Sequence, residues 1–278
     1  MFRRNNSEGG DSEREKSLHK VPEHDVPTPS IPSQRYSQPS TDWQRVNWQE
    51  RFQHLAENAH DPRLKKFYQA GLDAGITDAN MPISEVPMMV LDFETTGLNA
   101  AEHGILSIGA IPMNLQRISQ QQARMWLAKP RRNLPAESVV IHGITHSQIQ
   151  QAPDFIDILE EVLEFLAGRL LVVHYQGIER PFLAAAIEER IGEPIEFPVI
   201  DTMHLEARLH RQQQLTLWQR FRGEKQVSIR LADSRTRYGL PWYHPHDAIT
   251  DALATGELLQ AQIAHHYSPN TTIGELWS

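Results

Sequence analysis

The sequence predicts an α/β domain with a mixed β-sheet, and three observations lead to this fold class. Two apolar runs, 88–91 and 105–111, flank a turn and indicate a β-hairpin. A third strand is expected next to them at about 122–127. Helical and strand patterns then alternate along the rest of the chain, which is typical of parallel strands connected by helices.

The chain begins with two regions that precede this sheet. Residues 1–40 are polar and rich in Pro, Ser and Gln, so they bury too little apolar surface to offset the entropy cost of ordering, and we expect a disordered tail. Residues 41–80 are predicted to be a helical extension with amphipathic helices at 42–58 and 62–73. Their aromatic face either packs on the main domain or binds a protein partner.

The main domain is expected over 86–267. Its apolar periodicity continues after the three strands to near the end of the chain. The pattern predicts helices at 153–167, 180–190, 202–211, 228–237 and 246–266, and strands at 170–174 and 197–200.

Composition excludes several classes of protein. The net charge is −8, so a nucleic-acid substrate would have to be held by local basic patches or by metal ions. The chain contains no Cys, which excludes disulfides and thiolate metal sites. Neither a secretory signal nor an apolar run of membrane-spanning length is present, so we expect a cytoplasmic protein without a membrane partner.

Asp92 and Glu94 end the first apolar run. Side chains alternate along a strand, so the two carboxylates point to the same side among apolar neighbours. Like charges placed there repel and are costly to desolvate unless a cation lies between them, and carboxylate oxygens suit Mg²⁺ or Mn²⁺. An isolated D-x-E pair is more often a solvated strand end, so the metal interpretation depends on the rest of the chain.

Two later segments add acids at the starts of helices. Glu179 follows the apolar strand at 170–174. His246 and Asp251 lie five residues apart near the start of the last helix, whose alanines would allow a close approach to the sheet. Acids from strands and helices that face one another can hold two metal ions about 4 Å apart, and a nearby His can deprotonate a water molecule.

The order of these motifs resembles the DEDDh 3′–5′ exonuclease family, which includes the epsilon proofreading subunit of bacterial DNA polymerase III. The resemblance covers about 86–265. VLDFETTGL at 90–98 is similar to the family's first motif, HGIT at 142–145 to a loop of the epsilon-like branch, and IDT at 200–202 also fits. It implies an RNase H-like fold with a five-stranded mixed sheet flanked by helices.

The resemblance also implies a role for each matching residue. Two Mg²⁺ or Mn²⁺ ions per site would be bound by Asp92, Glu94, Glu179 and Asp251, and His246 would be the general base. Contacts to the terminal nucleotide would come from Phe93, Thr95, Thr96, Leu98 and His142.

The second motif departs from the family pattern. The family usually has H-N-x-x-F-D, whereas this chain has HYQGIE at 174–179, with Tyr175 in place of Asn and Glu179 in place of Asp. Glutamate carries the same charge and can still coordinate Mg²⁺, but its stem is one methylene longer, and small positional changes at a reacting centre can lower the rate strongly.

These observations predict a metal-dependent exonuclease that acts on the 3′ end of single-stranded DNA or RNA, with DNA favoured, and releases nucleoside 5′-monophosphates. One alternative is a catalytically weak, exonuclease-derived module that binds nucleic acid or protein, and another is a small-molecule phosphodiesterase. The arginine-rich stretch 208–237 could contact backbone phosphates or could be a solvated helical face.

Overall fold

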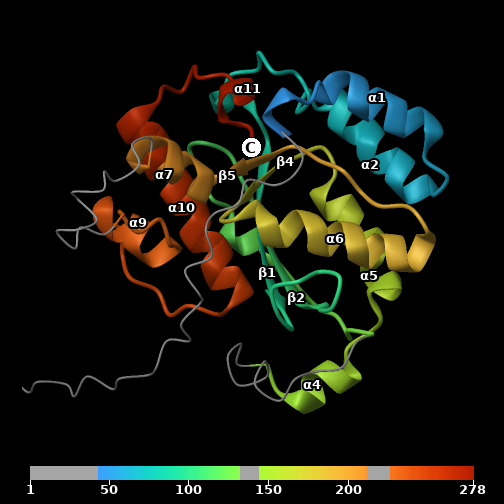
Figure 1. Ribbon diagram of the computed structural model, residues 1–278. Coiled ribbons are helices and arrows are strands. Elements are labelled where there is room, and N and C mark those ends of the chain that lie inside the picture. Colours follow the sequence, from blue (N-terminus) through green and yellow to red (C-terminus); the bar gives the residue numbers. More distant parts are fainter. Residues whose placement is uncertain (1–42, 132–143, 212–225) are drawn as a thin grey trace, which may run out of the picture. The chain divides into compact units, whose positions relative to one another are not determined.

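The computed structural model describes residues 43–131, 144–211 and 226–278. Their centre is a five-stranded sheet with strand order β3-β2-β1-β4-β5 (Figure 1). β1, β2 and β3 are antiparallel neighbours, while β4 and β5 run parallel to β1. The strands are β1 (Met88–Thr95), β2 (Ile105–Met113), β3 (Arg124–Leu127), β4 (Leu170–Val173) and β5 (Val199–Asp201). The predicted α/β fold with a mixed five-stranded sheet is confirmed.

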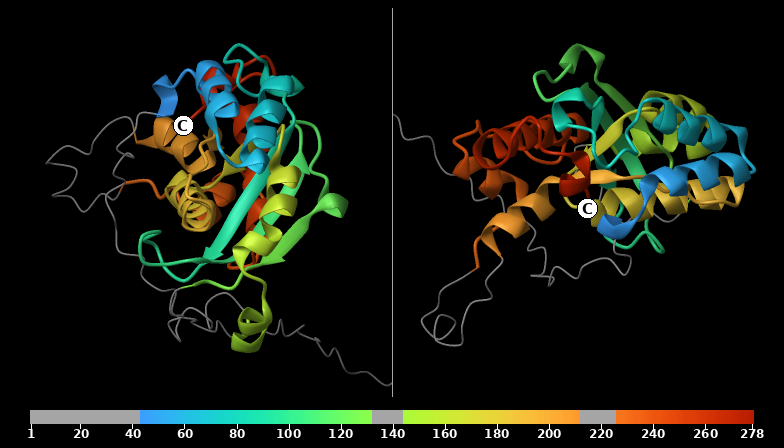
Figure 2. Two further views of the ribbon diagram at one scale, coloured as in Figure 1. Left: turned by 90° about the vertical axis from the view of Figure 1, so that its right-hand side faces the viewer. Right: turned by 90° about the horizontal axis from the view of Figure 1, so that it is seen from above.

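Helices cover both faces of the sheet. α10 lies on one face, and α5 and α6 lie on the other (Figure 2). Every residue of β2 is buried, because a sheet covered on both faces requires continuous apolar strands. The helices of this part of the chain are α4 (His146–Gln151), α5 (Phe155–Leu166), α6 (Gln176–Ile191), α7 (Thr202–His210), α9 (Leu231–Arg237), α10 (Ala248–His266) and α11 (Ile273–Leu276).

The helical extension consists of α1 (Trp48–Asn58) and α2 (Pro62–Asp73), preceded by a short 3₁₀ turn. Its aromatic side chains belong to the hydrophobic core, including Trp48, Phe52 and Tyr68, which are fully buried. The aromatic face of helices 42–73 is therefore covered by the chain itself and is not free to bind a protein partner. The sequence pattern was compatible with both outcomes, and intramolecular packing is the one observed.

A buried arginine connects this extension to α6. The Arg180 guanidinium lies 4.5 Å from the ring centroid of Trp43, 5.5 Å from that of Trp48 and 5.6 Å from that of Phe197. It also donates a hydrogen bond of 2.8 Å to the backbone oxygen of Ser278. Cation–π contacts are strongest when they are desolvated, so this cluster holds α1 against the rest of the fold.

The start of α6 differs from the prediction. The sequence predicted a helix over 180–190, whereas α6 begins at Gln176. The buried carboxylate of Asp201 explains the earlier start, since it accepts hydrogen bonds of 3.0 Å from the backbone N–H groups of Tyr175 and Gln176. Two orphan donors at the helix start are thereby satisfied by a residue from another element.

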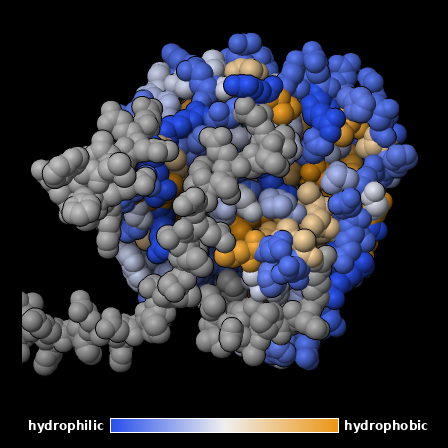
Figure 3. All heavy atoms as spheres, in the orientation of Figure 1, coloured by the Kyte–Doolittle hydropathy of each residue, from blue (hydrophilic) through white to orange (hydrophobic). Residues whose placement is uncertain are grey.

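The molecular surface is mostly hydrophilic on the face shown in Figure 3, where apolar side chains gather only in limited areas near the centre. Within the described part of the chain, no helix is both long enough and apolar enough to cross a membrane. The predicted tail, residues 1–40, lies outside the described residues.

Candidate active site

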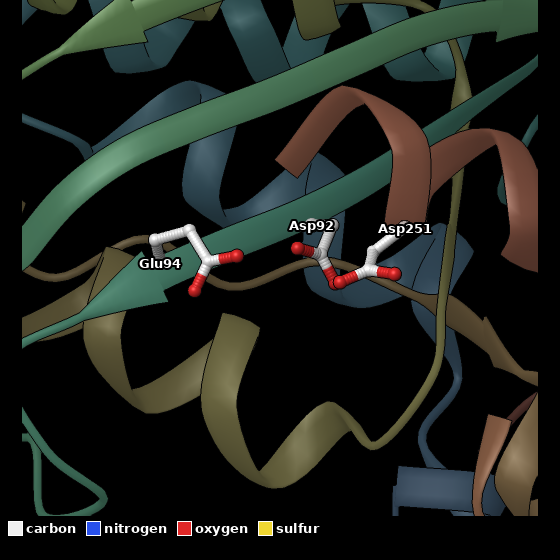
Figure 4. Close-up of side chains that lie close together, drawn as sticks. All are labelled: Asp92, Glu94 and Asp251. Carbon is white, nitrogen blue, oxygen red and sulfur yellow. The ribbon is translucent and has the colours of Figure 1, made fainter. Parts of the chain in front are cut away.

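Three carboxylates from two elements meet at one place. Asp92 and Glu94 come from β1, and Asp251 comes from the first turn of α10. One carboxylate oxygen of each residue lies within 4.8 Å of those of the other two. Figure 4 shows the Asp92 and Asp251 carboxylates facing each other, with Glu94 on the same strand as Asp92. The structure thus brings together residues that are more than 150 positions apart in the sequence.

A glycine in β2 allows α10 to bring Asp251 close to Asp92. Gly109 is the register partner of Asp92, so both positions face the same side of the sheet. A Cβ atom at Gly109 would lie 2.4 Å from the carbonyl carbon and oxygen of Ala248, the first residue of α10. The missing side chain lets the start of α10 touch the sheet, and Asp251 follows one turn later. An isolated Gly in a strand pattern indicates such a close approach, and this was the available sequence signal.

Burial and mutual repulsion both disfavour the ionised forms of these carboxylates. Burial raises the pKa of Asp92 well above its ordinary value, and the neighbouring carboxylates of Asp251, Glu94 and Glu179 raise it further. Burial likewise raises the pKa of Asp251 to about 6, although a hydrogen bond from the His246 backbone opposes this. Carboxylate oxygens held close together at such a cost form the donor set that Mg²⁺ or Mn²⁺ prefers, so the site fits a divalent cation.

Glu179 lies in the first turn of α6, and its charge acts on Asp92. It is not among the three described acids whose carboxylate oxygens lie within 4.8 Å of one another. Its side chain is buried, and its Oε2 atom has no hydrogen-bond partner among the described residues. Burial raises its pKa well above the usual value, with a further contribution from Asp201. A buried, unpartnered carboxylate oxygen is costly unless it binds something, which agrees with the predicted role of Glu179 as a metal ligand.

Asp201 is an important residue at the site that we did not predict individually. It is fully buried at the junction of β5 and α7, and it accepts hydrogen bonds from four backbone N–H groups at the starts of α6 and α7. It therefore fixes the turn that carries Glu179. The IDT motif at 200–202 was its sequence signal.

His246 is exposed and lies two residues before α10, which begins at Ala248 and not at residue 246 as predicted. Its φ angle of 72° places it in the left-handed region, which His adopts more readily than most residues. This conformation accompanies a hydrogen bond of 2.8 Å from its backbone N–H to Oδ2 of Asp251. The backbone of the predicted general base therefore orients a predicted metal ligand, while its imidazole is accessible to solvent.

The predicted nucleotide contacts fall into different environments. Leu98 is 52% exposed, as a residue that contacts a substrate must be. Thr95 and Thr96 are buried, and their hydroxyls bond within the turn, to Gly97 and Gly104 respectively. The side chain of Phe93 belongs to the core, and its contact with the terminal nucleotide stays a prediction. The remaining predicted contact, His142, lies outside the described residues.

The arginine-rich stretch 208–237 is largely used within the fold. Arg208 donates to the backbone oxygens of Glu275 and Trp277, and Arg211 to that of Val227. Arg237 pairs with the buried Glu206. These contacts favour a structural role over phosphate binding for Arg208, Arg211 and Arg237, while residues 212–225 lie outside the described part.

Comparison with known proteins agrees with this geometry. A family model described as Exonuclease (RNase_T) matches residues 89–259, which is more than half of the chain. The chain belongs to the exonuclease family. The matched segment contains Asp92, Glu94, Glu179 and Asp251, and the predicted membership in the DEDDh-type exonucleases is confirmed.

Two of the proteins that this exonuclease resembles carry the name of bacterial DNA polymerase III. It is 29% identical over 185 residues to the DNA polymerase III subunit epsilon of Treponema pallidum (strain Nichols), covering 66% of this chain and 80% of that protein. It is 27% identical over 230 residues to the PolC-type DNA polymerase III of Bacillus subtilis (strain 168), covering 76% of this chain. That match spans 15% of the PolC-type protein, so the two chains share one segment only.

Solved structures confirm the RNase H-like fold of this exonuclease. The cell-death related nuclease 4 (CRN-4) matches with a TM-score of 0.53 and 19% identity, covering 66% of this chain and 65% of CRN-4. The nuclease domain of 3′hExo, a DEDDh family member bound to rAMP, matches with a TM-score of 0.51 and 15% identity, covering 65% of this chain and 92% of that one.

The raised pKa of Asp251 predicts how stability depends on pH in this exonuclease. Because its folded-state pKa of about 6 lies above the unfolded value, this group stabilises the metal-free fold at low pH and stops doing so as the pH rises through 6. In EDTA, Asp251→Asn should therefore match the unmodified chain near pH 4 and have the higher Tm at pH 8. Thermal unfolding measured at both pH values tests this.

Metal binding should reverse the order of the two Tm values at pH 8. Added Mg²⁺ or Mn²⁺ binds the folded state alone and should raise the Tm of the unmodified chain more at pH 8 than at pH 5, with a smaller shift in Asp251→Asn. Equal metal-induced shifts in the two proteins would show that Asp251 does not bind the ion.

Proposed function

We propose that this exonuclease depends on divalent metal ions and removes nucleotides from the 3′ end of single-stranded nucleic acid, releasing nucleoside 5′-monophosphates. The observation that carries the proposal is the cluster of Asp92, Glu94 and Asp251, with one oxygen of each within 4.8 Å of the others. Family membership supports the phosphodiester as the bond that is cleaved. The names of the relatives, DNA polymerase III subunit epsilon and PolC-type DNA polymerase III, favour DNA over RNA as substrate.

The acids divide into two groups by their position. Asp92 and Glu94 lie on the rigid central strand, and Asp251 and Glu179 approach from α10 and α6. We assign all four as ligands for two Mg²⁺ or Mn²⁺ ions. When bound, such ions supply a nucleophilic water at neutral pH and neutralise charge on the phosphodiester.

His246 is the group that takes the proton in this proposal. A histidine imidazole positioned beside an attacking water is a common general base in enzymes. Its exposure allows it to face the substrate, and its backbone bond to Asp251 keeps it beside the acids. Leu98, on the exposed turn after β1, contacts the terminal nucleotide.

The test is a single-turnover digestion of 5′-labelled single-stranded DNA and RNA, first with Mg²⁺ and then with Mn²⁺. A ladder of 3′-shortened products that disappears in EDTA is expected, with DNA degraded faster. Tight binding of the oligonucleotide without cleavage in either metal would overturn the proposal and favour the catalytically weak binding module. Hydrolysis of p-nitrophenyl thymidine phosphate alone would indicate a small-molecule phosphodiesterase.

Replacing Glu179 with aspartate tests whether the longer side chain suits this backbone. Because α6 is held in place by Asp201 and by the packing of Arg180, it cannot move to compensate for a shorter carboxylate. We expect Glu179→Asp to lower kcat about 100-fold, since a displacement on the order of 1 Å has that effect on a reacting centre. It should also raise the Mg²⁺ concentration at half-maximal rate.

Glu179→Gln is the matched control for length, because it keeps the stem and removes the charge. It should be at least as impaired as Glu179→Asp. A faster Glu179→Asp enzyme would show instead that this chain has kept the fold and lost most of the chemistry that the usual aspartate supports.

A further inference from the structure

An exposed tryptophan lies in the segment between α9 and α10, shortly before the helix that carries Asp251. Trp242 is 65% exposed, the highest value among the exposed large hydrophobic side chains in the described part of the chain. It precedes His246 by four residues. Four residues of extended chain span at most about 14 Å, so the backbone of Trp242 lies within that distance of the backbone of the predicted general base.

The backbone around this tryptophan is held by a buried arginine of α9. Arg235 is 3% exposed and donates a hydrogen bond of 2.8 Å to the backbone oxygen of Pro241. Its guanidinium also lies 4.6 Å from the ring centroid of Tyr243. The residues on both sides of Trp242 are therefore attached to the same buried side chain.

The same arginine is fixed to α10. It donates hydrogen bonds of 2.6 Å to the backbone oxygen of Ala254 and 2.8 Å to Oε2 of Glu257. The hydroxyl of Tyr243 donates to the other oxygen of Glu257 at 3.0 Å. The segment thus runs along the first half of α10, the helix that carries Asp251.

This arrangement sets the direction of the indole. Tyr243 is turned toward α10, and Pro241 and Pro245 restrict the backbone on either side. Trp242 meets the ring of His244 edge-to-face, with centroids 4.5 Å apart and an interplanar angle of 70°. The exposed indole is therefore presented on an anchored backbone and not on a loose loop.

Single exposed hydrophobic residues are common and need no ligand, but this one has three further properties. It lies four residues before His246, its backbone is anchored by Arg235, and the described Arg208, Arg211 and Arg237 are occupied by contacts within the protein. In a chain of net charge −8, an aromatic ring offers a substrate contact that does not depend on positive charge. Every nucleobase can stack on an aromatic side chain, and a rigid ring loses little entropy on doing so.

We propose that Trp242 is a stacking platform for an unpaired base of the substrate strand, on the 5′ side of the nucleotide being removed. This inference rests on the proposed exonuclease function. It assigns to Trp242 the positioning of the strand and not a step of the chemistry, so its effect should appear in KM and not in kcat.

Steady-state digestion of a single-stranded oligonucleotide tests the proposal. Trp242→Ala should raise KM about tenfold with kcat within about twofold, and Trp242→Phe should restore most of the affinity, because a stacked base contributes on that order. Met125→Ala is the matched control, since Met125 is 52% exposed on β3 and takes no part in the argument, and it should leave KM unchanged. An unchanged KM in Trp242→Ala would overturn the inference.

Oligonucleotides with one abasic residue at successive distances from the 3′ end locate the contact. At the position that stacks on Trp242, the KM of the unmodified enzyme should rise to that of Trp242→Ala, and the variant should show no further rise. A uniform difference between the two enzymes at all positions would argue against a specific platform.

Binding separates this inference from the proposed function. Fluorescence anisotropy of a labelled oligonucleotide with Asp92→Asn should show about tenfold weaker binding when Trp242→Ala is added. That result would support the platform even if no chain cleaved the strand. Cleavage without any effect of Trp242→Ala on anisotropy or KM would refute the platform and leave the exonuclease function intact.

Discussion

Asp92→Asn should abolish exonuclease activity and at the same time stabilise the metal-free protein. Asp92 lies in the acid cluster, where burial and four neighbouring carboxylates raise its pKa. The amide keeps the shape but cannot supply the negative charge that binds a divalent cation, so we expect kcat to fall by at least about 10³-fold. In EDTA at pH 8 the variant should have the higher Tm, because one of the repelling charges has been removed.

The pairing of lost activity with gained stability distinguishes a functional site from a structural one. Asp73→Asn is the matched control, since Asp73 is an exposed acid of α2 that bonds only locally, to Gln69. It should leave both rate and Tm unchanged. An Asp92→Asn protein that lost activity and also unfolded at a lower temperature would show that the acid supports the fold and would weaken the metal assignment.

Gly109→Ala should disable the enzyme from a position that contacts no substrate. The added methyl group would occupy space filled by the backbone of Ala248, at 2.4 Å, and backbone cannot move aside as a side chain can. We expect the start of α10 to be pushed from the sheet, with a cost of about 1–3 kcal/mol in the free energy of unfolding. Asp251 would move with it, which should lower kcat on the order of 100-fold.

Gly256→Ala provides the comparison, since it adds a methyl group between the same helix and the same sheet. There the nearest atoms belong to side chains, Val90 at 3.0 Å and Ile118 at 3.1 Å, which can adjust. Gly256→Ala should therefore keep most of the activity. Circular dichroism at the assay temperature would establish that both variants are folded, and equal activity in the two would contradict the role assigned to Gly109.

Much of this site could be predicted from local sequence because the relevant signals are local. Strand periodicity placed Asp92 and Glu94 on one side of a strand, and helix periodicity placed Asp251 in the first turn of the last helix. It also placed His246 in that helix, whereas the helix begins at Ala248 and His246 precedes it in the left-handed region. The mixed sheet followed from a hairpin and a third strand succeeded by alternating elements.

Other features depended on atoms that are distant in sequence. The earlier start of α6 results from Asp201 capping it from β5, and no pattern within residues 174–190 contains that information. The aromatic face of the extension could equally have served a partner, and its burial is evident only from its packing around Arg180.

The sequence by itself determined the family, the sheet and the identity of the acids, because short motifs and local hydrophobic periodicity are sufficient to predict them. Tertiary structure alone decided how the acids meet. The contact of Ala248 with Gly109 brings Asp251 to Asp92, and the anchoring of Pro241 and Tyr243 by Arg235 turns Trp242 outward. Both depend on steric fit between elements far apart in the chain, and such a fit arises only when the elements are packed together.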